Sequence, residues 1–153
     1  MSLVTCDTNR SESAPLEALI ARCEADRASH MTGSACAAIE LRLVEQALGQ
    51  ALPPAFRLFL SRLGGGVFYL KHEIFGARRV MIHDIELVPD ILSFRAWLGP
   101  RVPAHLLPIH RADGIIHAIE LGDSPQSAVH RLGEAGGASY PDFAAFLRHV
   151  VVP

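Results

Sequence analysis

Histidine is the residue type in this chain that most strongly suggests a chemical role. The 153 residues include eight histidines, and His105, His110 and His117 lie with Asp113 within a stretch of thirteen residues. Imidazole and carboxylate groups at such spacings can bind zinc or act as general bases. A small histidine-dependent hydrolase is therefore one hypothesis for this sequence. The strict metalloprotease motif H-E-x-x-H does not occur in it.

The pattern around these histidines also has a structural explanation. His117 alternates with Ile115 and Ile119 on the apolar side of a predicted strand. A buried histidine with its hydrogen bonds satisfied is the usual occupant of such a position. Nothing in the spacing places the rings of His105, His110 and His117 on one face. We therefore predict no metal site, no cofactor and no catalytic residue.

Other catalytic signatures are missing from the sequence. There is no G-x-S-x-G motif, and Cys6, Cys23 and Cys36 show neither a C-x-x-C pair nor a catalytic context. Three cysteines without paired spacing favour reduced, mostly buried thiols in a cytoplasmic protein. The glycine run at residues 64–66 follows a predicted helix and precedes a predicted strand. This order is the reverse of a phosphate-binding P-loop, so the glycines indicate a helix end and a tight turn.

Charged residues in the second half of the chain suggest a protein-binding surface. Seven acidic residues between Lys71 and Asp123 are nearly balanced by six basic ones. Mixed charges around apolar anchors suit protein recognition, and binding residues favour loops. Single aromatic residues such as Trp97 and Tyr69 are anchor candidates, although a place in the core is more common for them. The predicted partner-binding residues lie in the loop 73–79 and the turn 111–114: Glu73, Arg78, Arg79, Arg111 and Asp113.

Composition limits the class of protein. A chain of this length fits one domain, and half of its residues are hydrophobic, which is enough for a core. A net charge of −2 without a basic cluster argues against nucleic-acid binding. No apolar run is long enough for a membrane span, and no signal peptide is recognised.

Periodicity predicts an α+β fold in which N-terminal helices pack on an antiparallel or mixed sheet and a C-terminal helix closes the domain. Residues 1–14 are predicted to be a loose tail, and residues 25–33 a linker. Helices are predicted to begin at Pro15, at Ser34 as N-cap, at Pro53, at Pro89 and near Ser139. Strands are predicted over residues 67–70, 74–75, 79–82, 85–87, 106–110, 115–121 and 128–132.

The stretch from Glu45 to Phe68 is the most informative part of the sequence. Gly49 ends a helix, Pro53 and Pro54 begin the next one, and its apolar stripe consists of Phe56, Phe59, Leu60 and Leu63. This order of motifs, together with Leu41, Val44, Glu45, Leu48, Leu52, Gly65 and Gly66, resembles the SUKH superfamily. Ile74-Phe75-Gly76, Leu106-Leu107-Pro108-Ile109 and Asp113-Gly114 extend the resemblance. Gly64 replaces the asparagine and Phe56 the tyrosine of the family pattern, and Ile116-His117 replaces its Gly-Asp.

The resemblance implies a function as well as a fold. SUKH members include bacterial immunity proteins and a yeast regulator of cell-wall synthesis. It implies a non-enzymatic module that binds a protein partner and neutralises a cognate toxin. A regulatory adaptor that scaffolds other proteins is the alternative within the same superfamily. The sequence leaves the oligomeric state open.

Overall fold

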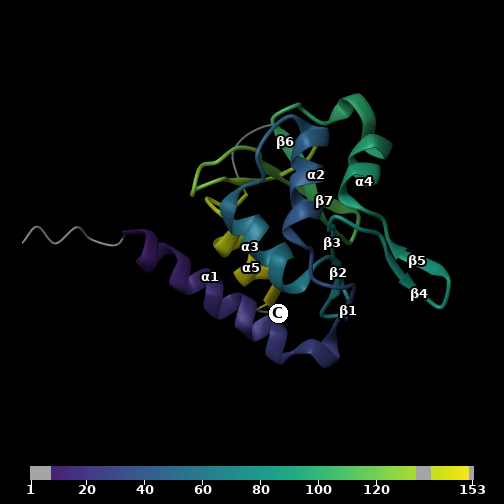
Figure 1. The fold of residues 1–153 in the computed structure, drawn as a ribbon, viewed down its shortest axis with the longest axis horizontal. Coiled ribbons are helices and arrows are strands. Elements are labelled where there is room, and N and C mark those ends of the chain that lie inside the picture. Colours follow the sequence, from purple (N-terminus) through teal and green to yellow (C-terminus); the bar gives the residue numbers. More distant parts are fainter. Residues whose placement is uncertain (1–7, 134–138, 152–153) are drawn as a thin grey trace, which may run out of the picture.

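The fold is built on an antiparallel six-stranded sheet with the strand order β1-β2-β3-β6-β7-β8. The computed structural model describes residues 8–133 and 139–151 (Figure 1). A two-stranded hairpin, β4–β5, projects from the body of the domain (Figure 1). The strands are β1 (Met31–Thr32), β2 (Gly66–Phe68), β3 (His72–Ile74), β4 (Val80–Ile82), β5 (Ile85–Val88), β6 (Leu106–Ala112), β7 (Ile115–Glu120) and β8 (Val129–Arg131).

Five helices accompany the sheet in the described residues: α1 (Thr8–Ala25), α2 (Ala38–Leu48), α3 (Pro54–Leu63), α4 (Ile91–Leu98) and α5 (Phe143–Val151). Helices α1, α3 and α5 pack against one another, and α4 packs on β6. Figure 1 shows α1, in purple, running beside α5, in yellow. The predicted α+β class, the antiparallel sheet and the closing helix are confirmed. No helix within residues 8–133 or 139–151 has the length and apolarity needed to cross a membrane.

Some predicted boundaries are wrong for identifiable physical reasons. Helix α1 begins at Thr8 and continues through Pro15, so the predicted loose tail is helical from Thr8 onward, while residues 1–7 lie outside the described part. A proline inside a helix removes one hydrogen bond but does not always end the helix. Helix α2 begins at Ala38 instead of near Ser34. The Glu40 carboxylate accepts a hydrogen bond from the Ala37 N–H at 3.0 Å, which is the glutamate half of a capping box and fixes the start of the helix at Ala38.

The predicted apolar stripe of α3 forms the centre of the core. Phe56, Phe59, Leu60 and Leu63 are all buried, as are Leu41 and Val44 of α2. Leu48 is half-buried and packs at the edge of the same core. The stripe therefore joins the two helices that flank the Leu-Pro-Pro turn, as the periodicity predicts.

The turn between α2 and α3 is held by a carboxylate. Glu45 accepts hydrogen bonds from the Leu52 N–H and from the Arg57 guanidinium, each at 2.8 Å. Arg57 also donates to the Leu52 carbonyl at 3.0 Å. Glu45 is thus a structural residue that fixes where α3 starts.

The three consecutive glycines lie where backbone segments approach closely. A Cβ atom on Gly64 would lie 2.3 Å from the Ser34 carbonyl oxygen, one on Gly65 2.5 Å from the Gly76 nitrogen, and one on Gly66 2.4 Å from the Met31 oxygen. The positive φ predicted for Gly65 or Gly66 is found at Gly66 (159°), close to extended backbone, and Gly64 also has one (68°). Glycine is therefore required here mainly because the backbone of β1 and of residues 74–76 packs directly against this turn and leaves no room for a Cβ atom.

Replacing Gly65 by Ala should destabilise the domain. The new methyl group would overlap backbone atoms that cannot rotate away, and overpacking of this kind costs about 3 kcal/mol. For a chain of this size we expect a fall in melting temperature of roughly 6–12 °C in a circular-dichroism melt. Gly33→Ala is the matched control, because its Cβ would make only ordinary contacts, the nearest with the Val80 Cγ2 at 3.4 Å. Equal melting temperatures for the two variants would contradict the prediction.

Candidate functional site

Three buried histidines form a continuous hydrogen-bonded chain across the sheet. His72 Nδ1 lies 2.9 Å from His110 Nε2, and His110 Nδ1 lies 3.1 Å from His117 Nδ1. The three side chains are 8%, 2% and 8% exposed. They come from the adjacent strands β3, β6 and β7, where His110 pairs with His117 and with Ile74. We call these three residues the histidine chain.

Helix α5 covers the histidine chain. The Phe146 ring contacts the rings of His110 and His117, and the His149 ring lies 6.2 Å from that of His72. Tyr140 contacts His117. The apolar stripe of α5 therefore places an aromatic wall over the imidazoles and removes them from water.

Burial keeps the histidine chain uncharged at neutral pH. Desolvation lowers the pKa of His110 from 6.5 to about 3 and that of His117 to about 4, and neighbouring imidazoles act in the same direction. Desolvation, assisted by Lys71 and His149, also lowers the pKa of His72. A neutral imidazole has one N–H and one lone pair, so each hydrogen bond in the chain requires one donor and one acceptor ring.

The predicted histidine group is only partly assembled. His110 and His117 do share a face, contrary to the expectation that nothing brings their rings together, because both lie on the same side of paired strands. His105 is exposed just before β6, and the Asp113 carboxylate pairs with Lys71 at 3.1 Å. The sequence reasoning missed His72. Its alternation with Ile74 was the available signal, but a three-residue strand is too short to reveal a period.

The hydrogen bonds of the histidine chain within the described residues are those of a buried polar cluster. Among the described residues, no serine, cysteine or carboxylate hydrogen-bonds to His72, His110 or His117. In the same part of the chain, no three His, Cys, Asp or Glu residues are grouped as metal ligands. Cys23 and Cys36 are buried and unpaired, and burial raises the pKa of Cys23 to about 11, so this thiol stays protonated. Cys6 lies outside the described residues.

The predicted partner-binding residues form ion pairs within the domain. Glu73 and Arg111 pair across β3 and β6 through two hydrogen bonds of 2.6 and 3.0 Å. The Arg111 guanidinium lies over the Phe75 and Phe94 rings, and the Glu73 hydrogen bonds raise its pKa. Arg78 pairs with Glu40, and Arg79 lies 4.0 Å from Glu86 of the hairpin. The structure therefore joins Glu73 to Arg111 and Asp113 to Lys71, and places Arg78 and Arg79 on a separate segment before β4.

The β4–β5 hairpin carries exposed apolar side chains. Val80 and Val88 are buried at its base, whereas Met81 and Ile82 are 42% and 36% exposed and Ile85 is 70% exposed. The tip turns through His83 and Asp84, which both have positive φ angles (50° and 63°), as in a type I′ turn.

A large aromatic residue is also exposed on the helix that follows the hairpin. Trp97 of α4 is 70% exposed, so the expectation that it belongs to the core is wrong for this residue. Phe94, one turn earlier, is buried and stacks on both Phe75 and Trp97. The inward face of this short helix is thus already filled, which leaves Trp97 on the outer side.

The chain matches no protein-family model and no curated protein sequence.

Proposed function

We propose that this domain is a non-enzymatic binding module of the SUKH immunity type, which binds and neutralises a cognate bacterial toxin in the cytoplasm. The observation that carries the binding role is the projecting β4–β5 hairpin with its exposed Met81, Ile82 and Ile85. Large apolar side chains held away from a core are typical of protein interaction sites.

The residues that carry the family resemblance have structural roles and do not belong to the exposed hairpin surface. Leu52, Phe56 and Phe59 are fully buried, and Glu45 holds the turn between α2 and α3. Because these side chains stabilise the fold, specific recognition of a partner protein has to use exposed residues elsewhere. The hairpin tip and Trp97 provide apolar anchors, and Arg79 and Glu86 provide a charged edge.

Two of the predicted partner-binding residues are less suited to contact a partner than the sequence suggests. Glu73 and Arg111 satisfy each other and are partly buried, so using either would first require breaking their pair. Separating this partly buried pair would leave two charges without their hydrogen bonds, and that cost would reduce the free energy gained by binding a partner. Arg78, Arg79 and Asp113 are exposed and remain candidates at the rim.

The test is co-expression with the product of the adjacent gene, scored by growth rescue and by co-purification. We expect Ile85→Glu to weaken the complex about thirtyfold or more, as truncated interface anchors do, without lowering the melting temperature. Leu43→Glu is the matched control, because Leu43 is 56% exposed on α2 and should leave binding unchanged.

The outcomes separate the parts of this proposal. A complex without growth rescue would reject toxin neutralisation and favour the adaptor function. Rescue that is insensitive to Ile85→Glu would reject the hairpin as the binding surface. Neither a complex nor rescue would reject the immunity function.

A further inference from the structure

A pocket of about 450 Å³ opens at the His72 end of the histidine chain. It lies between α1, the turn that connects β2 to β3, and the end of α5. Its volume is in the range of small-molecule sites. The lining residues are Arg22, Tyr69, Lys71, His72, His149, Val150 and Val151.

The polar part of this lining is basic. Arg22 and Lys71 carry fixed positive charges, two imidazoles accompany them, and no carboxylate among the described residues belongs to the lining. Lys71 also pairs with Asp113, which lies outside the lining, at 3.1 Å in an exposed ion pair that is weak enough to exchange for a ligand carboxylate. Arg22 uses its Nε on Asp26 at 3.2 Å, and its two terminal amino groups have no hydrogen-bond partner in the described residues. A guanidinium with both amino groups available can bind a carboxylate through two hydrogen bonds.

His72 contributes a polar atom that is available to a ligand. Its side chain is 8% exposed and Nδ1 is engaged by His110, but Nε2 hydrogen-bonds to none of the described residues. This nitrogen faces the pocket, so a ligand that covered it without accepting its hydrogen bond would leave it unsatisfied at a cost in binding free energy. Desolvation is the main cause of the lowered pKa of His72, Lys71 and His149 lower it further, and Asp113 opposes them.

The wall formed by the β2–β3 turn is held in a strained conformation. Tyr69 and Leu70 have positive φ angles of 52° and 58°. His30 Nδ1 accepts from the Tyr69 N–H at 3.0 Å, and the Tyr69 hydroxyl donates to Asp26 at 2.6 Å. Because His30 Nδ1 accepts, its Nε2 carries the hydrogen and donates to the Cys23 carbonyl. These bonds fix Tyr69 as a preformed side of the pocket.

We propose that this pocket binds an amphipathic monocarboxylate, whose carboxylate lies among Arg22, Lys71 and His72 Nε2–H and whose apolar part contacts Val150, Val151 and Tyr69. A bare phosphate would satisfy the basic groups but would leave the apolar wall uncovered. A neutral lipid would cover the wall and leave His72 Nε2 unpaired. Only a ligand with both parts satisfies both halves of the lining.

Binding would also select one hydrogen-bond direction in the histidine chain. If His72 donates from Nε2 to the ligand, its Nδ1 must accept from His110 Nε2–H. His110 Nδ1 must then accept from His117 Nδ1–H, because each neutral ring has one hydrogen. The tautomer of His117 therefore indicates whether a ligand is bound at His72, although His110 lies between the two rings.

Nuclear magnetic resonance of the isotope-labelled full chain at pH 7.5 tests this, with octanoate as the probe. We expect saturable binding with a Kd of about 1 mM or tighter. Octanamide and inorganic phosphate should each bind at least about tenfold more weakly, because octanamide lacks the carboxylate and phosphate lacks the apolar chain. Imidazole nitrogen shifts should show Nε2–H on His72 and Nδ1–H on His117 in the bound protein.

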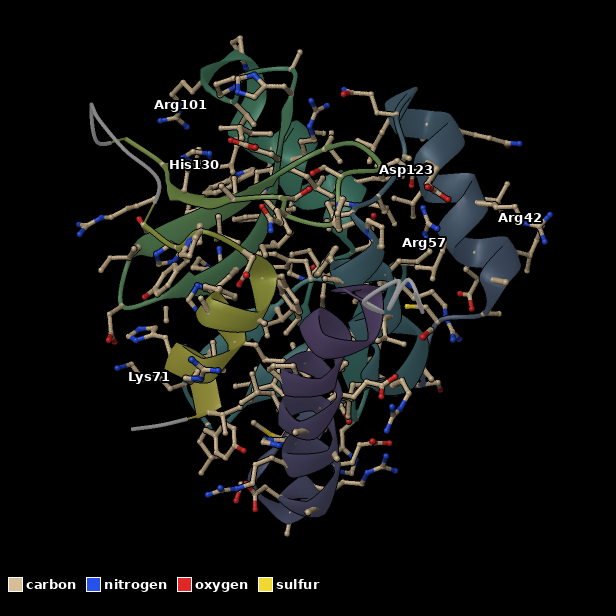
Figure 2. All side chains as sticks on the ribbon, turned by 90° about the vertical axis from the view of Figure 1, so that its left-hand side faces the viewer. Arg42, Arg57, Lys71, Arg101, Asp123 and His130 are labelled. Atoms are coloured by element: carbon tan, nitrogen blue, oxygen red, sulfur yellow. The ribbon has the colours of Figure 1, made fainter. Side chains whose placement is uncertain are left out.

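Variants separate this pocket from general surface charge. Arg22→Gln and Lys71→Gln should each weaken octanoate binding about tenfold, whereas Arg42→Gln should not. Figure 2 shows Lys71 beside α5 and Arg42 on the outer side of α2, on opposite sides of the view. Equal binding of octanamide, equal loss in Arg42→Gln, or the opposite tautomer of His72 in the bound protein would overturn the proposal.

Discussion

Lowering the pH from 6.5 to 4.5 should remove about 4 kcal/mol of the free energy of unfolding, mainly through His110 and His117. In the unfolded chain each of these imidazoles binds a proton near pH 6.5, whereas in the folded chain the pKa values are about 3 and 4. Between those limits the unfolded state holds more protons, so stability falls as the pH falls. Each group contributes about 2 kcal/mol over these two pH units, less than the full 1.36 kcal/mol per unit because the unfolded imidazole is only half protonated at pH 6.5.

The loss is large relative to the stability of a typical domain, which is about 5–15 kcal/mol. The groups that act on His110 all make its protonation unfavourable: His72 on β3, His117 on β7, His149 on α5 and Lys71 in the β2–β3 turn. Within the described part of the chain, no carboxylate appears among these groups. We therefore expect the domain to be close to its unfolding midpoint near pH 4.5 if its stability at neutral pH lies at the lower end of that range.

Urea unfolding between pH 7.5 and 4.5 measures this effect. The slope of the unfolding free energy against pH gives the number of protons taken up on unfolding. His117→Gln should reduce this number by about one, whereas His83→Gln and His105→Gln, at exposed positions, should not. A pH titration of the imidazole resonances in the unsubstituted protein is a second test, and it does not require that the variants fold. Ordinary titration of His110 or His117 near pH 6.5 in the folded state would contradict the prediction.

The helical half of the fold is readable from the sequence because its signals are local. The stripe from Phe56 to Leu63 repeats at helical spacing, and the glycine and proline residues around it mark where helices end and begin. The role of Glu45 was not predicted, because its partners, Leu52 and Arg57, come together only when the turn is formed.

The candidate sites were harder to predict because they depend on strand register. His72 and His110 lie 38 residues apart, His110 and His117 lie 7 apart, and only the pairing of β3, β6 and β7 makes them adjacent. A one-residue shift in that pairing would put them on opposite faces of the sheet. Short strands carry too few residues to determine the register from alternation alone.

The hairpin shows a second limit of sequence reading. Its strands were predicted at nearly the correct positions, but alternation could not show that they leave the main sheet. The turn residues His83 and Asp84 are unusual for a type I′ turn, which favours Asn and Gly, so the turn gave no clear hairpin signal. Ile85 is exposed because the hairpin leaves the main sheet, and Trp97 is exposed because the inner face of α4 is already filled.

Truncating Phe59 to Ala should cost about 3–5 kcal/mol, the usual range for a fully buried phenylalanine. Its ring is 0% exposed and contacts Phe68 of β2 and Phe143 of α5 at centroid distances of 5.4 and 5.6 Å. The side chain therefore joins a helix, the sheet and the closing helix at one point. A cavity there would weaken three interfaces at once, and the surrounding aromatic rings cannot move far enough to fill it.

Urea unfolding at pH 7.5 should reveal this loss as a lower midpoint with an unchanged slope against denaturant. Phe59→Leu retains most of the volume and should lose clearly less, because the remaining cavity is smaller. Leu43→Ala is the surface control, since Leu43 is 56% exposed and should change stability by no more than about 0.5 kcal/mol. If Phe59→Ala behaved like Leu43→Ala, α3 would not be the element that connects the helices to the sheet, and the core described above would be wrong.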